Sequence, residues 1–479
     1  MQQQPDNINL PLCVDLDGTL VRTDTLHEHL LSTMFHSTLS TLYSAKHLLS
    51  GKARFKSELS NIRDFSADHL PVNEQVTDLI ASQPSGRETI LVTGASSQIA
   101  NAVAEKTGLF TSVMSSDDQT NLTGEIKRQK LVNTFGEKGF DYIGNDYVDM
   151  PVFESANRGY LISRDEKLIQ STKDQFSHVD CLKEDSLGLK EWLKLLRAHH
   201  WVKNVLIFIP LFLEHRLFDA NAVISAILCF IAFSLLASLT YILNDLHDLK
   251  SDRQNTVKST RPLASGLISI SASVKVVAAL LAIFLVLLLI LPKAVITVLL
   301  FYLVATLSYT LFIKQILFLD VVTLACLQTL RIIAGIFAIN SAWSFWVLSF
   351  SIFFFVSLAL AKRVAELKNL GKENRTDTVG RGYAVDDETI LLPAGVSAGN
   401  ISVLIVALYI NSDKVINMYN YPEFLWGLCP LLIYWLGRVW IVTARGYMTE
   451  DPLVYALKDR VSSFLLFIFF ACIVLASPA

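Results

Sequence analysis

The sequence has few cysteines, and none of them stand in the spacing that disulfide frameworks or zinc sites use. Its six cysteines are scattered over 479 residues without a CxxC pair, and four of them lie inside apolar stretches. We therefore expect neither a disulfide scaffold nor a zinc site. An excess of charge of one sign is also lacking, because 41 basic and 44 acidic residues give a net charge of −3. With no basic domain apparent, we expect no nucleic-acid partner.

The N-terminus lacks the basic region and apolar core of a secretory signal peptide, so we expect the first part of the chain to stay in the cytoplasm. The chain is too long for one ordinary domain. Hydrophobic residues make up 52% of it, but they are segregated. Up to about Asp185 the composition is that of a soluble protein, and beyond Trp201 apolar runs alternate with short charged loops. The sequence thus predicts a soluble domain followed by a membrane domain.

Three apolar segments of the first part are each followed by a polar, glycine-containing turn. The predicted strands are residues 12–14, 89–92 and 140–143. The turns begin at Asp15, Thr93 and Gly144. Such turns are typical of an open α/β fold with a parallel sheet and a site at the carboxyl ends of its strands. Between the first two strands, residues 26–82 carry apolar residues at helical spacing, which predicts a small helical insertion.

These turns resemble the motifs of the haloacid dehalogenase (HAD) superfamily of phosphatases over roughly residues 9–165. The resemblance implies a Rossmann-like sheet with a helical cap at about residues 24–85. It implies that Asp15 is the nucleophile that forms an aspartyl-phosphate and that Asp17 is the general acid and base. Thr93 would hydrogen-bond the phosphoryl oxygens. The alternative is a fold kept as a scaffold without activity.

The same resemblance implies a lysine and a Mg²⁺ ion beside the nucleophile. Lys130 would neutralise the phosphoryl group, with Lys127 as the nearby competitor for that role. The implied metal ligands are Asp15, the carbonyl of Asp17, and the turn with Asn145, Asp146 and Asp149. The family usually has an aspartate where this chain has Asn145. Either a neighbouring aspartate supplies the missing charge or the metal affinity is reduced.

The second part of the chain contains nine apolar stretches close to the length that spans a bilayer, of which the first and last are short. They are Trp201–Leu217, Ala222–Leu243, Val274–Leu291, Ala294–Ile313, Leu317–Ile339, Trp343–Ala361, Leu391–Ile410, Phe424–Val442 and Val461–Leu475. We therefore expect an α/β domain at residues 1–165, a linker at 166–189 and an all-α polytopic membrane domain of about nine helices at 190–479. An amphipathic helix is expected at 186–196, with Trp192 at the interface.

Basic residues concentrate in the loops on one side of the predicted membrane. Fourteen Lys and Arg residues lie in loops on the side of the N-terminal domain, and three lie in the other loops, namely Arg216, Lys293 and Lys414. Basic loops favour the cytoplasm, and an odd number of spans separates the termini. We expect a multi-pass protein of the cytoplasmic (inner) membrane, with the N-terminal domain in the cytoplasm and the C-terminus outside.

An acidic motif follows the second predicted span. Asn244, Asp245, Asp248 and Asp252 fall on one broad face if the helix continues past the membrane surface. Carboxylates with water and phosphate oxygens are the ligands that Mg²⁺ prefers. The motif therefore predicts a site for a Mg²⁺-diphosphate at the membrane boundary, whereas the alternative is a solvated helix end that is acidic by chance.

Two arginines, Arg331 and Arg438, lie within predicted spans, where charge is costly and marks a lined cavity. For Arg331 we favour a role in function, and for Arg438 a position at the inner interface is an equal alternative. The other candidate substrate-binding residues lie in or next to the cytoplasmic loops. They are Lys203, Asn204, Lys258, Arg261, Tyr309, Lys314, Lys362, Arg363 and Arg381.

The acidic motif and the following Arg261-Pro262-Leu263-Ala264-Ser265-Gly266 resemble the UbiA superfamily of intramembrane transferases, over about residues 190–479. The resemblance implies transfer of a prenyl group from a prenyl diphosphate to an aromatic acceptor. Typical members carry a second aspartate-rich motif after helix six. This chain has a basic segment there, Lys362 to Lys368, and Gly380-Arg381-Gly382-Tyr383.

One acidic motif facing a basic cluster suits two phosphorylated substrates, one held by metal and one by Lys and Arg. Within the superfamily this combination resembles the decaprenyl-phosphate phosphoribosyltransferases, as do Trp201-Val202-Lys203-Asn204 and Glu450-Asp451-Pro452. The implied reaction moves 5-phosphoribose from phosphoribosyl pyrophosphate (PRPP) to a polyprenyl phosphate, with one Mg²⁺ in each domain. The HAD-like domain would remove the 5′-phosphate of the product.

Two alternatives remain open. One is a prenyltransferase that acts on an aromatic or other small acceptor. The other is a transporter with a regulatory soluble domain, which is disfavoured because the acidic motif lies at the inner boundary rather than at the midplane and no inverted repeat is evident.

Overall fold

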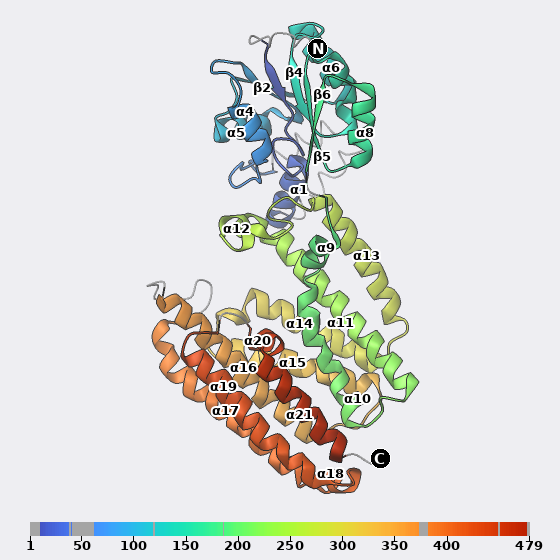
Figure 1. Cartoon of the computed structure of the whole chain (residues 1–479), viewed down its shortest axis with the longest axis vertical. Coiled ribbons are helices and arrows are strands. Elements are labelled where there is room, and N and C mark those ends of the chain that lie inside the picture. The colour runs from blue at the N-terminus through green and yellow to red at the C-terminus, as the bar shows by residue number, and fades with distance from the viewer. Residues whose placement is uncertain are drawn as a thin grey trace. The chain divides into compact units, whose positions relative to one another are not determined.

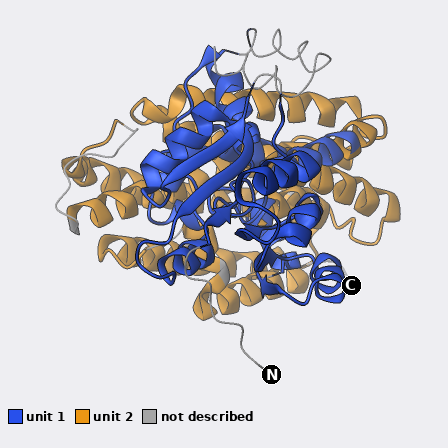
Figure 2. Ribbon diagram, turned by 90° about the horizontal axis from the view of Figure 1, so that it is seen from above, with its two compact units in different colours: residues 1–199, 238–282 blue, residues 200–237, 283–479 orange. Residues whose placement is uncertain are grey.

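The computed structural model describes residues 10–37, 40, 62–117, 120–184, 186–372, 382–448 and 451–476. The chain divides into two compact units (Figure 2). Unit 1 comprises residues 1–199 and 238–282, and unit 2 comprises residues 200–237 and 283–479. The domain boundary expected near residue 190 does not coincide with this division, because unit 1 also contains residues 238–282. The segment that carries the acidic motif belongs to the same unit as the α/β domain.

Unit 1 contains a six-stranded, fully parallel sheet of order β3-β2-β1-β4-β5-β6. Its strands are β1 (Leu12–Val14), β2 (Thr89–Ser96), β3 (Ser112–Ser116), β4 (Asp141–Gly144), β5 (Gly159–Ser163) and β6 (Val179–Lys183). The strand order reverses at β1, which pairs with β2 on one side and β4 on the other. Ligands of open α/β sheets bind at the carboxyl ends of the strands beside such a reversal. The predicted parallel sheet is confirmed.

Helices cover both faces of this sheet because the short strands are apolar on both sides. The helices are α1 (Thr25–His36), α4 (Glu74–Ala81), α5 (Ser97–Thr107), α6 (Gly124–Phe135), α7 (Met150–Ser155) and α8 (Glu166–Gln175). Leu12 and Val14 pack in one core with α4 and α5, and Cys13 between them packs in a second core with α6, α7 and α8. Figure 1 shows α4 and α5 on one side of the strands and α6 and α8 on the other.

One expectation about this unit is corrected. The predicted linker at 166–189 is largely structured, because α8 buries Leu168 and Ile169 in the sheet's core and β6 pairs along the whole of β5. Residues 38–39 and 41–61 of the expected cap at 24–85 lie outside the described residues, and α4 at its end belongs to the layer that covers the sheet. The amphipathic helix expected at 186–196 is present as α9 (Leu189–Leu195).

The acidic motif lies where α11 (Ala220–His247) ends and α12 (Leu249–Gln254) begins. The helix does not run on unbroken, because Asp248 leaves helical geometry with φ −90° and ψ 9°. Backbone hydrogen bonds still link Asp248 to Asn244 and Asp252 to Asp248. A compact turn follows, and then α13 (Ile270–Leu288).

Unit 2 is helical, and its core lies between α15, α16, α17 and α19. Besides parts of α11 and α13, its elements are, in chain order, the 3₁₀ segment η3 (Ala198–Phe208), α10 (Ile209–Leu213), α14 (Lys293–Leu311), η5 (Ile313–Gln315), α15 (Leu319–Ala338), α16 (Phe345–Lys372), η6 (Val385–Asp387), α17 (Glu388–Ile410), α18 (Asp413–Met418), η7 (Pro422–Gly427), α19 (Leu428–Ala444), α20 (Pro452–Lys458) and α21 (Arg460–Ala476). A second cluster joins α17, α18, α19 and α21.

Seven helices of the described chain are long and apolar enough to cross a membrane. They are Ala220–His247, Ile270–Leu288, Lys293–Leu311, Leu319–Ala338, Phe345–Gly371, Val385–Ile410 and Pro422–Ala444. They correspond to the seven central stretches of the nine expected. The first and last are shorter apolar helices, Ala198–Leu213 and Arg460–Ala476, so the expected count of nine is not established.

Candidate functional sites

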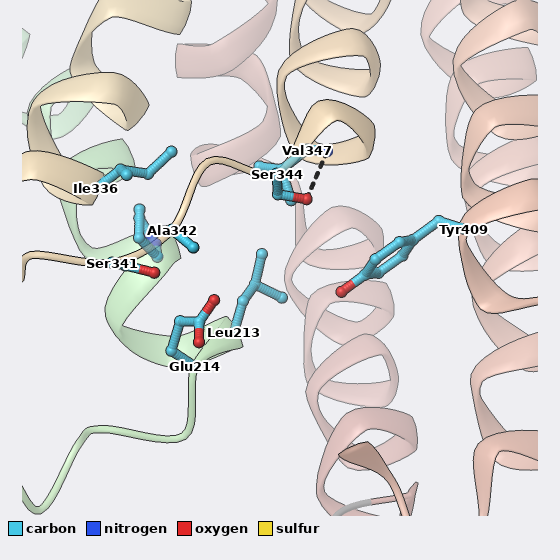
Figure 3. A pocket seen from close by; sticks show the side chains of 9 residues that line it. Leu213, Glu214, Ile336, Ser341, Ala342, Ser344, Val347 and Tyr409 are labelled. Carbon is cyan, nitrogen blue, oxygen red and sulfur yellow. Dashed lines mark hydrogen bonds between the residues drawn. The ribbon is translucent and has the colours of Figure 1, made fainter. Parts of the chain in front are cut away.

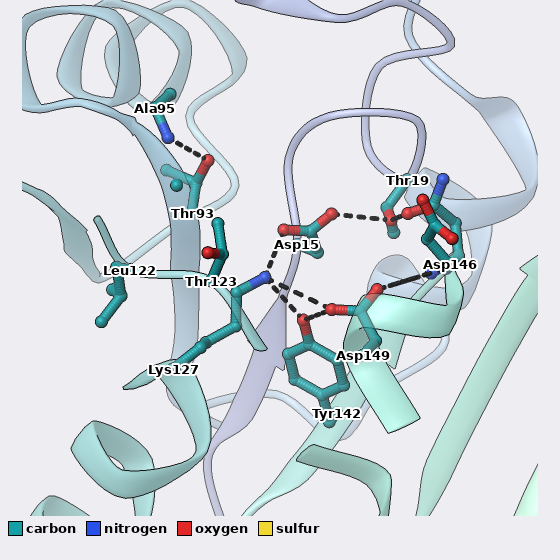
Figure 4. A network of polar contacts seen from close by, with 12 residues as sticks. Asp15, Thr19, Thr93, Ala95, Leu122, Thr123, Lys127, Tyr142, Asp146 and Asp149 are labelled. Atoms are coloured by element: carbon teal, nitrogen blue, oxygen red, sulfur yellow. Dashed lines mark hydrogen bonds and ion pairs between the residues drawn. The ribbon is translucent and has the colours of Figure 1, made fainter. Parts of the chain in front are cut away.

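The turn after β1 carries Asp15, whose carboxylate lies against a buried lysine of α6 (Figure 4). Nζ of Lys127 lies 2.6 Å from Oδ1 of Asp15, 2.9 Å from the hydroxyl of Tyr142 and 3.4 Å from Oδ1 of Asp149. Tyr142 donates a hydrogen bond of 2.7 Å to the same oxygen of Asp149. All four side chains are buried, and one ammonium group bridges two carboxylates.

The charges of this cluster shift one another's protonation. Burial raises the pKa of Asp15 to about 7, with the Lys127 ammonium opposing the rise and the Asp149 carboxylate adding to it. Burial lowers the pKa of Lys127, but the two carboxylates outweigh it and raise the pKa above its ordinary value. Lys127 therefore stays charged. A carboxylate with a shifted pKa beside a specific cation, at the end of a strand, is typical of a functional site.

Lys127, and not Lys130, occupies the position beside Asp15. Lys127 and Leu131 are the buried residues of α6, four positions apart on one face. Lys130 is exposed. The structure therefore places the competitor Lys127, and not Lys130, beside Asp15, and the phosphoryl-neutralising role stays a prediction. The spacing of Lys127 from the apolar residue Leu131 is the sequence signal that favours Lys127.

The other residues expected here lie at the ends of β1, β2 and β4. Oγ1 of Thr19 is 3.1 Å from both Oδ2 of Asp15 and Oδ1 of Asn145. Oδ1 of Asp17 accepts a hydrogen bond of 2.7 Å from the backbone N–H of Thr25, where α1 begins. The expected residues of the first and last motifs are thus brought to one edge of the sheet.

Thr93 is fully buried at the point where β2 turns irregular. Its Oγ1 accepts a hydrogen bond of 2.9 Å from the N–H of Ala95, which fixes the turn. A Cβ on Gly94 would lie 2.6 Å from the methyl of Thr123, so this position requires glycine. The turn is thereby held close to the segment that leads into α6.

The acidic turn after β4 is braced internally. Oδ1 of Asp149 accepts from Tyr142 and Lys127, and its Oδ2 accepts from the backbone N–H groups of Asn145 and Asp146 at 3.1 and 3.3 Å. Oδ1 of Asp146 caps the N–H of Tyr147. Both carboxylate oxygens of Asp149 thus already accept hydrogen bonds, and the metal role expected of Asp146 and Asp149 stays a prediction.

A divalent cation fits better at the other side of Asp15. Oδ2 of Asp15 and Oδ1 of Asn145 both face the single hydroxyl of Thr19, which has one hydrogen for two acceptors. An oxygen-rich position with few protein ligands is the kind that Mg²⁺ accepts, with water and phosphate completing its shell. Across the described ranges there is no group of three or more His, Cys, Asp or Glu side chains that could hold a metal ion.

The acidic motif of unit 1 forms two pairs rather than one row of four. Asp245 and Asp252 are buried and both contact Nη1 of Arg261, and Asp245 also pairs with Arg197. Asn244 and Asp248 form the second pair, in which Nδ2 of Asn244 donates to Asp248 at 3.1 Å. The buried pair converges on one cationic position, so its oxygens suit a cation.

Two lysines of unit 2 share one carboxylate. Nζ of Lys203 in η3 lies 2.8 Å from Oδ2 of Asp451, and Nζ of Lys362 in α16 lies 3.4 Å from the same atom. Burial alone would raise the pKa of Asp451, but the two ammonium groups outweigh it and hold the pKa at about 2. Asp451 also caps α20 through the N–H of Leu453. This cluster carries a net positive charge.

Arg331 lies in the middle of α15 with neutral partners. Its guanidinium donates to Oδ1 of Asn204 at 2.9 Å, to the hydroxyl of Tyr302 at 2.9 Å, to Oε1 of Gln328 at 3.1 Å and to the carbonyl of Leu327 at 2.6 Å. The side chain is buried. No carboxylate of the described chain pairs with it, so its charge is not neutralised within unit 2.

A glycine sets the distance between η3 and α15. A Cβ on Gly335 would lie 2.1 Å from the carbonyl oxygen of Ile207. The two backbones therefore touch one turn away from the contact between Asn204 and Arg331. Asn204 is itself held by Ser234, which accepts from its Nδ2 at 3.0 Å.

Arg363 pairs with carboxylates inside the helical core, and its expected role with substrate stays a prediction. Its guanidinium contacts Asp320 at 2.7 Å, Glu366 at 2.6 Å and the hydroxyl of Tyr309 at 3.1 Å. The hydroxyl of Tyr383 donates to Asp320. A buried arginine paired with two carboxylates holds α14, α15 and α16 together, and Tyr309 belongs to the same network.

The remaining expected residues are spread out. Lys258 in the 3₁₀ helix η4 (Lys258–Thr260) lies 3.5 Å from Asp252, and Lys314 lies in η5 at the end of α14. Arg438 pairs with Asp459 at 2.9 Å. Arg381 lies outside the described residues. Sequence reasoning missed Tyr142 and Asp320, because a partner from a distant strand or helix leaves no local signal, and it found Asp451 only through a resemblance.

A pocket of unit 2 lies away from these charged clusters (Figure 3). Leu213, Glu214, Ser341, Val347 and Tyr409 are among the residues that line it. Val347 and Lys362 lie on the same helix, fifteen positions apart, which corresponds to roughly 22 Å. The pocket is therefore not part of the lysine cluster.

Comparisons with known proteins place these observations in a family. Residues 205–448 match the UbiA prenyltransferase family. The uncharacterized protein y4nM of Sinorhizobium fredii is 38% identical over 461 residues, which cover 95% of this chain and 89% of that protein. The nodulation protein NoeC of Azorhizobium caulinodans is 33% identical over 264 residues, or 55% of this chain and 85% of that protein.

Two further similarities are weaker. The decaprenyl-phosphate phosphoribosyltransferase of Corynebacterium glutamicum is 30% identical over 179 residues, which cover 36% of this chain and 54% of that protein. A solved structure of a UbiA homolog from Archaeoglobus fulgidus bound to DMAPP and Mg²⁺ has a TM-score of 0.44 and 17% identity, covering 60% of this chain and 99% of that one.

The seven candidate spans and the family match define the class of the protein as a polytopic integral membrane transferase. The chain belongs to the UbiA prenyltransferase family, because the family match covers more than half of its length. It carries in addition an N-terminal domain with a parallel six-stranded sheet.

Proposed function

We propose that this protein transfers 5-phosphoribose from PRPP to the phosphate of a polyprenyl phosphate, and that its N-terminal domain removes the 5′-phosphate of the product. The observation that carries the proposal is the excess of positive charge in unit 2. Arg331 has neutral partners within the described chain, and Lys203 and Lys362 share the single carboxylate of Asp451.

This excess argues for a second anionic substrate. Lys203 and Lys362 share the carboxylate of Asp451 and Arg331 pairs with none in the described chain, so these three cations gain by binding an anion. A lipid phosphate is such an anion, and it is already a nucleophile, so that no general base is needed. An aromatic acceptor would leave these cations unmatched. The proposal therefore assigns the lipid phosphate to Lys203, Lys362 and Arg331.

The acidic motif is assigned to the leaving group. Asp245 and Asp252 converge on one cationic position, and Asn244 and Asp248 lie beside them. When bound there, Mg²⁺ would neutralise the pyrophosphate that leaves. The C1–O bond of PRPP breaks, and a bond forms between C1 and an oxygen of the lipid phosphate. Arg261 moves off the two carboxylates and is then available to the pyrophosphate oxygens.

The similarity to the phosphoribosyltransferase of C. glutamicum supports this assignment over part of the chain. That protein is named for decaprenyl phosphate, and the match covers 54% of it. For this chain both the lipid and the sugar donor are therefore part of the proposal.

The N-terminal domain is proposed to be a phosphatase of the HAD type. Asp15 attacks the phosphorus and forms an aspartyl-phosphate, while Asp17 protonates the leaving ribose oxygen and then activates water. Lys127 neutralises the phosphoryl oxygens, because its ammonium already lies 2.6 Å from the nucleophile. Asp15 and Asn145 would hold the Mg²⁺ of this domain. The two active domains share one chain, which raises the local concentration of the intermediate.

The proposal includes the orientation of the protein. We propose that the acidic motif and the N-terminal domain face the cytoplasm of a cell bounded by the inner membrane, where PRPP is soluble, and that the C-terminus is outside. The excess of basic residues in the loops on that side supports this topology.

A second candidate is prenyl transfer from a prenyl diphosphate to a small acceptor. The match of residues 205–448 to the prenyltransferase family favours it. The test is incubation of the purified protein with labelled PRPP and polyprenyl phosphate, and separately with a labelled prenyl diphosphate. Label from PRPP in the lipid phase supports the first function. Turnover of the prenyl diphosphate without any lipid-linked ribose contradicts it.

A further inference from the structure

The N-terminal domain is joined to the segment after the acidic motif by a buried ion pair. Nη2 and Nη1 of Arg253 lie 2.6 and 3.2 Å from the two carboxylate oxygens of Glu28 on α1. The side chain of Arg253 is 7% exposed and that of Glu28 is 11% exposed. Thr23 donates to Glu28 at 2.8 Å, and Nε of Arg253 donates to the carbonyl of Ala264 at 3.0 Å. All of these residues belong to unit 1.

The turn at residues 261–268 fits closely against the same domain. Gly266 has φ +71°, and a Cβ there would lie 2.8 Å from Cβ of Arg22 and 3.0 Å from Cγ of Pro71. Nη1 of Arg164 donates to the carbonyl of Leu267 at 2.6 Å. The position therefore requires glycine for both its backbone conformation and its surroundings.

Apolar packing completes the interface. Leu31 of α1 is buried in one cluster with Leu246, Leu249 and Leu263. The ring of Phe35 meets that of His247 edge to face, with centroids 4.9 Å apart. One face of α1 thus packs directly on the helix end that carries the acidic motif.

These contacts determine where Arg261 lies. Arg253 directly follows Asp252, and Arg261 opens the turn whose backbone is closed by hydrogen bonds from Ser265 to Arg261 and from Ile268 to Pro262. The guanidinium of Arg261 contacts both Asp245 and Asp252. A turn held by the N-terminal domain therefore presents its arginine to the buried carboxylates.

We infer that Glu28 is a positioning residue for the acidic motif. Through Arg253, the N-terminal domain holds the turn at residues 261–268 in place, and it does so whether or not it acts as a phosphatase. The inference rests on the proposed function only where it concerns transfer. The docking itself is a property of unit 1.

The first test measures docking without any substrate. Hydrogen–deuterium exchange of residues 258–268 is followed in the full-length protein and in Glu28→Gln, Arg253→Gln, the double variant and Gly266→Ala. Breaking one side of the buried pair leaves an unpaired charge, so the amides of residues 258–268 should exchange about tenfold faster or more in Glu28→Gln and in Arg253→Gln. In Gly266→Ala the added methyl group should have the same effect, because it meets Arg22 and Pro71. The double variant should be no worse than the single ones, because it leaves no unpaired charge. Arg158→Gln, which removes the exposed pair with Asp180, is the control and should change nothing here.

The second test measures transfer in the same variants and in Asp15→Asn. Glu28→Gln should lower kcat for transfer by about tenfold or more, since a misplaced group of the site costs about that much. Asp15→Asn, which removes the nucleophile but keeps the interface, should retain transfer. If the losses of kcat in Glu28→Gln and Arg253→Gln add up in the double variant, Glu28 does not act through Arg253.

The outcomes separate the two claims. Unchanged exchange in Glu28→Gln and Gly266→Ala would overturn the docking. Faster exchange with unchanged transfer would overturn the positioning role. Faster exchange in the variants, together with a wild-type protein that forms no lipid-linked ribose, would support the docking and contradict the proposed function.

Discussion

Nζ of Lys127 lies 2.6 Å from Oδ1 of Asp15, although 112 residues separate the two in the chain. The pair joins the first strand of the sheet to α6 and leaves Lys130 in solvent. Lys127 is therefore the lysine that lies beside Asp15. Its ammonium group also lies 3.4 Å from Asp149, which belongs to the acidic turn after β4.

Replacing Lys127 should therefore strongly reduce the proposed phosphatase activity, whereas replacing Lys130 should not. Lys127→Met removes the cation beside the nucleophile, and activity on a small phosphoester should fall by about 100-fold or more. It should also destabilise the domain by about 3–5 kcal/mol, because two buried carboxylates lose their partner. Lys130→Met is the matched control. Equal losses in both variants would contradict the assignment.

Arg331→Gln should reduce transfer strongly, and Arg438→Gln should not. The first removes the cation of α15 that has neutral partners, and the second removes one that already pairs with Asp459. The KM for the anionic lipid should rise by about tenfold or more in Arg331→Gln, because a charge-assisted contact of about 1.5–3 kcal/mol is lost. Steady-state kinetics with polyprenyl phosphate as the varied substrate measures this. An unchanged KM would contradict the assignment of the lipid phosphate to Arg331, on which the proposed function rests.

Gly335→Ala should weaken the contact between Asn204 and Arg331 without touching either residue. The added methyl would lie 2.1 Å from the carbonyl oxygen of Ile207, so η3 must move away from α15. We expect a loss of about 1–3 kcal/mol in stability, together with reduced transfer. Gly437→Ala, where a Cβ meets nothing within 4 Å, is the control for thermal unfolding. A thermal unfolding temperature that is the same in both variants would show that the close approach is unimportant.

Removal of divalent cations should stop transfer, and Asp252→Asn should raise the Mg²⁺ concentration that transfer needs. Asp252 is one of two buried carboxylates that converge on a cationic position. Titration of Mg²⁺ after treatment with a chelator measures the shift. Asp219→Asn, which affects an exposed ion pair with Arg216, should leave the Mg²⁺ concentration that transfer needs unchanged. Full transfer in the presence of excess chelator would exclude the metal role of the motif.

Asp15→Asn should separate the two proposed reactions. The variant keeps the shape of the site but lacks the nucleophile, so a lipid that carries 5-phosphoribose should accumulate at the expense of the dephosphorylated product. Thin-layer separation of the labelled lipids distinguishes the two. If the wild type and the variant give the same lipid, the N-terminal domain acts on another substrate.

Much of the fold follows from local patterns. Strand ends at Asp15, Thr93 and Gly144 predicted the parallel sheet, because the polar turns of such sheets are encoded next to the strands. The seven long apolar helices were equally visible. The edge strand β6 was missed, since among its five residues only Val179 is buried and the alternation is weak.

The sites were predicted less completely, for a physical reason. The buried pair of Arg363 with Asp320 joins two helices through residues 43 positions apart, and no periodicity reports such a partner. The four residues of the acidic motif were expected on one helical face, but Asp245 and Asp252 share Arg261, whereas Asn244 and Asp248 contact each other. The pair of Glu28 and Arg253 spans 225 positions and could come only from the structure.

The most direct test of the account is mass spectrometry of the lipids formed by the purified protein from polyprenyl phosphate, PRPP and Mg²⁺. The account predicts that the wild type yields the starting lipid with one added ribosyl group. In Asp15→Asn the lipid should carry one added phosphoribosyl group instead. An unmodified polyprenyl phosphate, in a preparation that consumes a prenyl diphosphate with a small acceptor, would contradict it.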